Sequence, residues 1–243
     1  MVSDPRAQSF GAVAELYDQY RPPPPEEAAT LLGDLTGLDV LEVAAGTGIW
    51  SRFLLGLGAN LTIVEPDDQM RAVLVRRSPE AHALVGSAES LPVEESSFDL
   101  VLVSSAWHWF RQPDATIEMA RVLRDGGRLF VQWNGFGRDV EWVNELSKLR
   151  DQSVRPRSWR ATELSDAGLF HDVQDLSIDW TWRRTIDELV KHFGTYSGVI
   201  VRTDEERQRM RELVRAHLDT VSDDGVVDVP MTLRGTVAVR SVR

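Results

Sequence analysis

Short apolar runs alternate with segments of helical apolar spacing through residues 39–133. Runs bounded by glycine or polar turns predict buried strands, and apolar positions recurring every three to four residues predict helices. The expected strands span residues 39–44, 61–64, 82–85, 98–103 and 128–133, and the expected helices span residues 49–57, 67–76 and 114–123. Asp125-Gly126-Gly127 is expected to separate the last of these helices from the fifth strand. Buried strands that alternate with helices predict an α/β fold with a doubly wound, Rossmann-like sheet of five parallel strands.

Both ends of the chain depart from this rhythm. Phe10 to Tyr20 is amphipathic, and the prolines at 22–25 separate it from the first α/β unit because each ring fixes φ and removes an N–H donor. The polar stretch from Asn134 to Arg160 interrupts the pattern. Beyond it, the sequence predicts partial strand alternation over 173–182, helices over 186–193 and 204–218, and alternating positions over 226–239. These late strands are expected to add an antiparallel hairpin to the sheet edge.

Composition narrows the class of protein. The 243 residues include 42% hydrophobic and 27% charged residues, as in a globular protein with a core. The net charge of −11 disfavours nucleic acid as a partner. The absence of cysteine excludes disulfides, thiolate metal sites and cysteine nucleophiles, and the five histidines lack metal-ligand spacing, so no metal is expected. Neither a leader peptide nor a membrane-spanning stretch is expected, and the predicted location is cytoplasmic.

The strongest local signal is the turn in VLEVAAGTG, residues 40–48. Its glycines let the backbone approach a ligand closely, and the helix that follows offers unpaired amides. Such a turn can serve any nucleotide or be merely structural. The carboxylate of Glu42 is a poor neighbour for a pyrophosphate and suits a cationic ligand better, and Ser51 occupies the place of the third glycine in a dinucleotide fingerprint.

Glu65 closes the second strand. Open α/β sheets bind ligands at the carboxyl ends of their strands, where a carboxylate typically accepts both ribose hydroxyls. The alternative is a solvated acid at a strand end.

Six segments, in order, carry a resemblance to a known family: FGAVAELYDQYRP, LEVAAGTG, TIVEPDDQM, GSAESLPVEESSFDLV, SSAWHWF and ARVLRDGGRLFVQWN. The chain resembles the class I S-adenosylmethionine-dependent methyltransferases, particularly the small-molecule enzymes of the type 11 group. The resemblance implies one methyltransferase domain over residues 1–243. Residues 1–25 would form an N-terminal lid, 26–134 the cofactor-binding core, and 135–243 a helical, substrate-capping insertion with the terminal strands.

The resemblance also implies the cofactor, S-adenosyl-L-methionine, and its product, S-adenosyl-L-homocysteine. Glu42 and the turn from Ala44 to Gly48 would hold the methionine half, and Glu65 the ribose. The remaining residues implied to lie at the cofactor are Tyr17, Arg21, Gly46, Pro66, Met70, Ala88, Glu89 and Ser104. Within this set Met70 would flank the adenine, and Ala88 would offer its backbone amide to the adenine ring, with Glu89 beside it. Ser104 would lie near the methionine amine, and Tyr17 and Arg21 would belong to the lid.

Two positions depart from the family pattern. Ala44 replaces the first glycine of the turn and adds a methyl group where backbone and ligand approach. Ser87 stands where the family commonly has an aspartate that binds the adenine amino group. Both departures are expected to weaken cofactor affinity without removing the site.

The substrate side of the site is expected to be aromatic. Trp107 and Trp109 follow the fourth strand and flank His108, which is either a general base or a structural residue in an aromatic wall. The late insertion supplies further candidates for the acceptor pocket, of which Tyr196 is the one we select. Its other members are Trp159, Trp180, Trp182, His192, Phe193 and Ser197.

The expected function is methyl transfer to an oxygen or nitrogen of a small-molecule acceptor, by a monomer or homodimer. Two alternatives remain open at this stage. One is a protein of the same fold that binds S-adenosylmethionine without transferring methyl. The other is a nicotinamide-dependent oxidoreductase, which Ser51 and the lack of a Tyr-x-x-x-Lys pair disfavour.

Overall fold

The computed structural model describes residues 9–137, 139–149, 164 and 168–242. The chain forms two compact units. The first comprises residues 1–22, 135–155 and 179–232, and the second comprises residues 23–134, 156–178 and 233–243. Trp159, a candidate for the acceptor pocket, lies outside the described residues.

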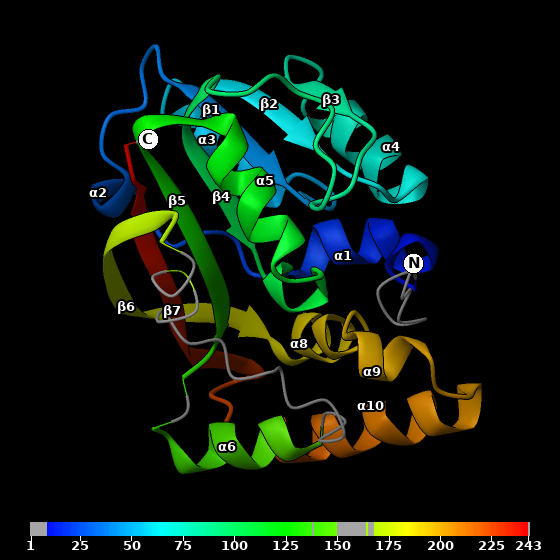
Figure 1. Ribbon diagram of the computed structural model, residues 1–243. Helices are drawn as coiled ribbons and strands as arrows, with labels where there is room; N and C mark the ends of the chain where they lie inside the picture. Colours follow the sequence, from blue (N-terminus) through cyan, green and yellow to red (C-terminus); the bar gives the residue numbers. More distant parts are fainter. Residues whose placement is uncertain (1–8, 138, 150–163, 165–167, 243) are drawn as a thin grey trace. The chain divides into compact units, whose positions relative to one another are not determined.

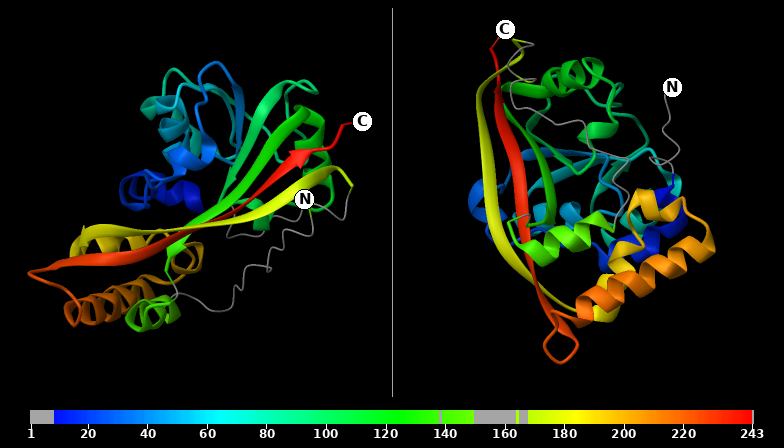
Figure 2. Two further views of the ribbon diagram at one scale, coloured as in Figure 1. Left: turned by 90° about the vertical axis from the view of Figure 1, so that its left-hand side faces the viewer. Right: turned by 90° about the horizontal axis from the view of Figure 1, so that it is seen from below.

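A seven-stranded sheet has the order β3-β2-β1-β4-β5-β7-β6 (Figure 1). The strands are β1 (Asp39–Val43), β2 (Asn60–Val64), β3 (His82–Leu84), β4 (Phe98–Ser104), β5 (Leu123–Phe136), β6 (Phe170–Thr185) and β7 (Val226–Arg240). Strands β1 to β5 pair in parallel. Figure 2 shows the two late strands, β6 and β7, side by side as long curved ribbons. The predicted Rossmann-like class, five parallel strands with a C-terminal addition, is confirmed.

Helices of the second unit cover both faces of this sheet (Figure 1). They are α2 (Ala28–Leu32), α3 (Ile49–Gly56), α4 (Asp68–Arg77) and α5 (Asp114–Val122), with a 3-10 turn, η2 (Trp107–Trp109). Trp50 and Leu54 of α3 pack with Val40 and Leu102 in one buried cluster. Met119 of α5 packs in another cluster, with strand residues whose side chains point to the opposite face of the sheet, such as Leu41 and Val103. Alternate side chains of β1 and β4 therefore pack into two hydrophobic cores, one on each face of the sheet, as expected for strands buried on both faces.

One predicted boundary is wrong. Asp125-Gly126-Gly127 lies inside β5 and does not precede it. The pairing with β4 shifts from Phe98–Leu123 to Leu100–Arg128, so the extra residues form a bulge. Gly126 has φ +77°, which lets the backbone make this detour without a steric penalty from a side chain.

The first unit is largely helical. It contains η1 (Phe10–Val13), α1 (Ala14–Tyr20), α6 (Glu141–Lys148), α8 (Ile186–Phe193), α9 (Ser197–Ile200) and α10 (Asp204–Asp219). Helix α6 falls in the stretch where no element was expected. Its Val143 and Leu146 are fully buried, with Leu189 of α8 and Val214 of α10 in the same cluster.

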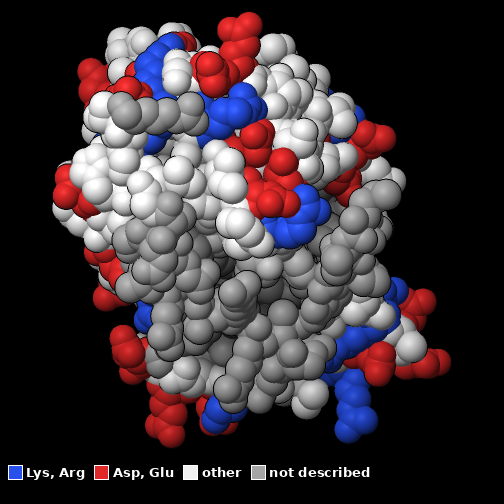
Figure 3. Space-filling view, in the orientation of Figure 1, with Lys and Arg blue, Asp and Glu red and all other residues white. Residues whose placement is uncertain are grey.

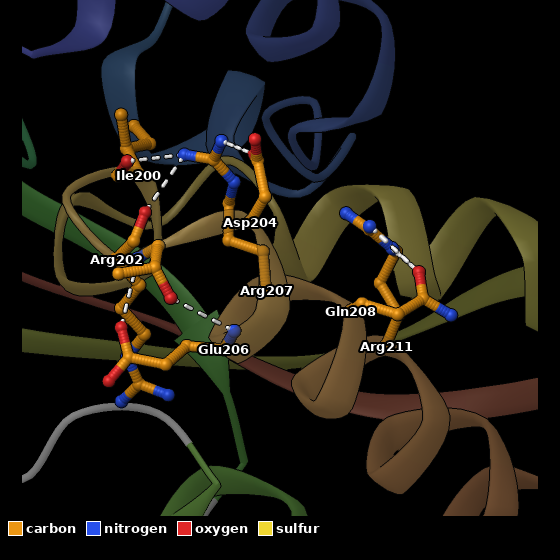
Figure 4. Close-up of polar contacts among 8 residues, drawn as sticks. Ile200, Arg202, Asp204, Glu206, Arg207, Gln208 and Arg211 are labelled. Carbon is orange, nitrogen blue, oxygen red and sulfur yellow. Dashed lines mark hydrogen bonds and ion pairs between the residues drawn. The ribbon is translucent and has the colours of Figure 1, made fainter.

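Side chains fix the start of α10, as Figure 4 shows. Thr203 and Glu206 form a capping box that satisfies backbone amides at the helix start. Arg207 donates to the carbonyl oxygens of Ile200 and Arg202, at 3.0 and 3.1 Å, and pairs with Asp204. These contacts fasten the turn that joins α9 to α10.

Candidate functional site

The candidate site of the second unit lies at the carboxyl ends of β2, β1 and β4, beside Gln132 of β5. Val43 is aligned with Val64 on one side and with Val103 on the other, and Ser104 is aligned with Gln132. Each of Val64, Val43 and Val103 is followed along the chain by Glu65, Ala44 or Ser104. These three residues and Gln132 therefore lie in a row across the carboxyl-terminal side of the sheet. We call these four residues the strand-end row.

Glu42 is a buried acid just below this edge, with 1% of its surface exposed. Ser51 Oγ, in the first turn of α3, donates to Glu42 Oε2 at 2.5 Å. Burial raises the pKa of Glu42 to about 8, and the hydrogen bond from Ser51 opposes this rise. Glu42 Oε1 has no hydrogen-bond partner among the residues that the structure describes. Such a carboxyl group is stabilised when a hydrogen-bond donor or a cation approaches it.

Glu65 fastens the glycine turn to β2. Its Oε2 accepts from the Gly46 amide at 2.7 Å, and its Oε1 accepts from the Asp67 amide at 2.9 Å. Burial raises the pKa of Glu65 to about 7, and these two hydrogen bonds oppose the rise. Each carboxylate oxygen retains a further lone pair, so Glu65 can still accept two hydroxyl donors.

Left-handed backbone conformations shape the turn itself. Gly46 and Gly48 have φ of +62° and +80°, and Ala44 has φ +56°. The first glycine of the family pattern is thus a position of positive φ, which alanine adopts at a steric cost. A Cβ on Gly48 would lie 3.0 Å from Leu74 Cγ and 3.2 Å from Ser51 Oγ, so this glycine also leaves room for the partner of Glu42.

The start of α4 lies against the turn. Asp67 caps the helix by accepting from the amides of Gln69 and Met70, both at 2.9 Å. Met70 is buried, and its Cε lies 3.8 Å from the point where a Cβ on Gly46 would stand. Pro66, between Glu65 and the cap, is exposed. The structure therefore places Met70 beside the turn, and its contact with adenine stays a prediction.

Ala88 and Glu89 lie in the loop between β3 and β4. Ala88 is buried in the cluster that includes Leu91 and Val64. Glu89 Oε1 accepts from the Arg111 amide at 2.7 Å, and Ser87 is exposed. The contact of this loop with adenine stays a prediction.

Ser104 ends β4 beside Gln132 of β5. Gln132 Nε2 donates to Ser104 Oγ at 2.6 Å, and the Gln132 carbonyl oxygen accepts from the Ser105 amide at 2.8 Å. Gln132 was not predicted from the sequence, and Ser51 was considered only as a replacement for the third glycine of a dinucleotide fingerprint and not as a partner of Glu42. The only signal was their type, a polar residue in an otherwise apolar strand and a serine in a glycine position.

The aromatic segment after β4 forms η2. Trp107 is 3% exposed and belongs to the core cluster around α5, whereas Trp109 is partly exposed beside it. Trp133 Nε1 donates to His108 Nδ1 at 3.5 Å. A neutral imidazole that accepts at Nδ1 carries its proton on Nε2, so His108 then presents a donor and not a base. Roles for Trp107 and Trp109 in substrate binding stay predictions.

Tyr17, Arg21 and Tyr196 come together within the first unit. The Arg21 guanidinium carbon lies 4.8 Å from the Tyr17 ring centroid and 4.4 Å from that of Tyr196, and Arg21 Nη2 donates to the Thr195 carbonyl at 2.9 Å. His192 bridges the Tyr20 carbonyl and the Tyr196 hydroxyl, both at 3.0 Å. The sequence predicted roles for all three and named His192 among the acceptor-pocket candidates, but it did not predict the hydrogen bonds through which His192 joins Tyr20 to Tyr196. Their contribution to a cofactor site stays a prediction.

Comparison with known proteins connects this geometry to a family. Residues 41–131 match the family model described as a methyltransferase domain. An uncharacterized methyltransferase of Mycobacterium tuberculosis is 34% identical over 236 residues, which cover 95% of this chain and 96% of the relative.

Solved structures share the fold. The YcgJ protein of Bacillus subtilis has a TM-score of 0.57 at 20% identity and covers 97% of this chain and 99% of its own. Phosphoethanolamine N-methyltransferase 2 of Haemonchus contortus, in complex with phosphomonomethylethanolamine and S-adenosylhomocysteine, has a TM-score of 0.60 at 15% identity. That match covers 100% of this chain and 61% of the other.

Proposed function

Since the chain belongs to the methyltransferase family, we propose that it transfers a methyl group from S-adenosylmethionine to an oxygen or nitrogen atom of a small molecule. The observation that carries the proposal is the pair of buried acids, Glu42 and Glu65, on either side of the glycine turn. One acid is poised for a cation, and the other retains acceptor capacity for hydroxyl groups.

The residues at the strand ends fit the cofactor. S-adenosylmethionine carries a primary ammonium group, two ribose hydroxyls and a sulfonium, all of which are cations or hydrogen-bond donors. The fully buried Glu42 Oε1 and Thr47 Oγ1 have no hydrogen-bond partner in the described part of the chain, and Glu65 has lone pairs to spare. An acceptor-rich, acidic turn of this kind disfavours the pyrophosphate of a nicotinamide cofactor.

When bound, S-adenosylmethionine supplies a methyl group already activated on a positively charged sulfur, and S-adenosylhomocysteine is the product. The chain therefore has to align the reactants, and such alignment can lower a barrier by about 7–11 kcal/mol. Glu65 would hold the ribose and Met70 would cover the adenine. Glu42 would neutralise the ammonium group.

A proton acceptor is needed only if the acceptor group keeps its proton at the working pH. His108 is the candidate base, although the contact with Trp133 favours a proton on its Nε2. A carboxylate acceptor would need no base. The role of His108 therefore depends on the acceptor.

Two observations support a small acceptor. The face of the molecule shown in Figure 3 carries both acidic and basic side chains among its described residues, and the net charge of −11 disfavours a polyanionic partner. The Haemonchus neighbour, which shares the fold, is bound to a small phosphorylated amine.

No helix among the described residues is long and apolar enough to cross a bilayer. The cytoplasmic location and the monomeric or homodimeric state remain predictions.

Calorimetry tests the cofactor directly. S-adenosylmethionine and S-adenosylhomocysteine are expected to bind, and NADH is not. Incubation with methyl-labelled donor and panels of phenols, carboxylic acids and amines then tests transfer. Failure to bind S-adenosylmethionine would overturn the proposal. Tight binding without transfer to any panel member would favour the alternative of a binding protein.

A further inference from the structure

Gln132 extends the strand-end row one strand beyond the residues implied by the family resemblance. Residues alternate between the faces of a strand, so Ser104 shares a face with Leu102, which is aligned with Glu42 of β1. Gln132 is aligned with Ser104 and faces the same way. Neighbouring strands lie about 4.8 Å apart, which sets Gln132 two strand spacings from β1.

The side chain of Gln132 is fully buried at the last aligned pair of β4 and β5, where an apolar residue would cost less. Its Nε2 donates to Ser104 Oγ, whereas its Oε1 has no hydrogen-bond partner within the described residues. A Cβ on Gly235 of β7 would stand 3.0 Å from Gln132 Cβ and 2.5 Å from Phe130 Cε2, so the glycine leaves room for this arrangement.

Both unpartnered side-chain oxygens that β1 and β5 place on this face are acceptors. They are Glu42 Oε1 and Gln132 Oε1. A ligand group that approaches Gln132 Oε1 must carry a hydrogen-bond donor, and one that also reaches Glu42 Oε1 needs a second donor. A primary ammonium group carries three donors, and its charge favours ionisation of Glu42, whereas a hydroxyl group carries one donor and no charge.

We propose that Gln132 binds the primary ammonium group of the methyl donor through its Oε1, opposite Glu42, and holds Ser104 in place through its Nε2. The proposal rests on the function proposed above and adds a residue to the same site. Gln132 thereby sets the selectivity of the site for a donor with a free amino group.

The test is a double-mutant cycle on binding, measured by calorimetry in the Gln132→Met variant, which conserves side-chain length without a hydrogen-bonding oxygen. The ligands are S-adenosylhomocysteine and its analogue in which hydrogen replaces the amino group. The variant is expected to bind S-adenosylhomocysteine about tenfold more weakly, the effect of one hydrogen bond to a charged group. It is expected to bind the deaminated analogue as the unaltered protein does.

Two further variants make the outcome decisive. Gln132→Glu restores an acceptor oxygen and is expected to recover the affinity for S-adenosylhomocysteine. Gln112→Met is the control. Gln112 is a partly buried glutamine of the second unit that precedes α5 and accepts a hydrogen bond from the Thr116 hydroxyl, and its replacement is expected to leave both affinities unchanged.

The proposal is overturned if Gln132→Met weakens both ligands equally, or weakens neither, because Gln132 would then be structural. An unaltered protein that binds neither ligand would instead overturn the proposed function itself.

Discussion

Glu65 Oε2 accepts a hydrogen bond from the Gly46 amide at 2.7 Å, so the acid at the end of β2 holds the turn that follows β1. The second oxygen of Glu65 holds the Asp67 amide at the start of α4. One carboxylate thus fixes the two backbone segments between which a ligand at the strand ends would lie. The side chain of Glu65 therefore both stabilises these two backbone segments and is proposed to bind the ribose.

We expect Glu65→Gln to weaken S-adenosylmethionine binding by at least tenfold. The amide retains one oxygen for the backbone but replaces the other with a donor, which faces both an N–H group and the ribose hydroxyls. Calorimetry measures the affinity, and thermal unfolding monitors the fold. Glu118→Gln is the matched control, since Glu118 also accepts a backbone amide, that of Leu91 at 2.8 Å, away from the strand-end row. Equal affinities in both variants would remove Glu65 from the site.

The two buried acids predict how stability depends on pH. Their pKa values are raised by burial from 4.5 to about 8 for Glu42 and about 7 for Glu65. The unfolded chain ionises first, so the folded state loses stability as pH rises from about 5 to about 8. The melting temperature of the ligand-free protein should fall across this range.

Glu42→Gln should flatten the upper part of that dependence, because an amide does not titrate. Glu145→Gln should leave it unaltered, since a hydrogen bond from Lys148 lowers the pKa of Glu145 and moves its titration below this window. Melting curves at half-unit pH intervals give the result. A melting temperature that rises from pH 5 to pH 8 in the unaltered protein would contradict the assignment.

Gly48→Ala should lower both stability and cofactor affinity. An alanine at φ +80° costs about 1–2 kcal/mol, and its Cβ would press on Leu74 and on Ser51, the partner of Glu42. Gly126→Ala separates the two effects, because Gly126 has φ +77° but no atom within 4 Å of the added Cβ. Chemical denaturation and calorimetry on both variants are the measurements. If the two variants lose the same stability and the same cofactor affinity, the contact of the added Cβ with Ser51 has no effect on cofactor binding.

The sequence predicts most of the sheet because its strands are apolar runs, which periodicity detects. It also places Glu42 and Glu65 at strand ends, where topology brings them together. The bulge at Gly126 escapes prediction because a glycine pair is read as a stop unless the pairing with β4 is known. Gln132 and Ser51 escape it for another reason. Each is hydrogen-bonded to a partner on a different element, Ser104 or Glu42, and one sequence does not reveal such pairs.

Ala44→Gly should tighten cofactor binding with little change in stability. Removal of the methyl group relieves the cost of φ +56° and opens the approach to the turn, while the added freedom of the unfolded chain costs up to about 1 kcal/mol. Asp172→Gly, at φ +48°, is the control for backbone relief away from the turn. Binding isotherms and melting temperatures distinguish the two. Weaker binding in Ala44→Gly would show that the methyl group contributes a favourable contact.

His108→Gln separates the two roles of His108. The hydrogen bond from Trp133 to Nδ1 leaves Nε2 as a donor, and a glutamine amide can replace a donor but not a base. If His108 orients the acceptor by donation, the variant should keep turnover within about tenfold and an unchanged pH profile of kcat/KM. If His108 is the general base, turnover should fall by a factor of about 10²–10⁴. The contact with Trp133 favours the first outcome.

Trp133→Phe tests that contact separately, because it removes the N–H group that donates to His108 Nδ1. Nδ1 can then carry the proton, and Nε2 can accept one. Enhanced turnover of a phenol or alcohol acceptor in Trp133→Phe, lost again in the double variant with His108→Gln, would establish that the hydrogen bond from Trp133 keeps His108 from accepting the proton of the acceptor.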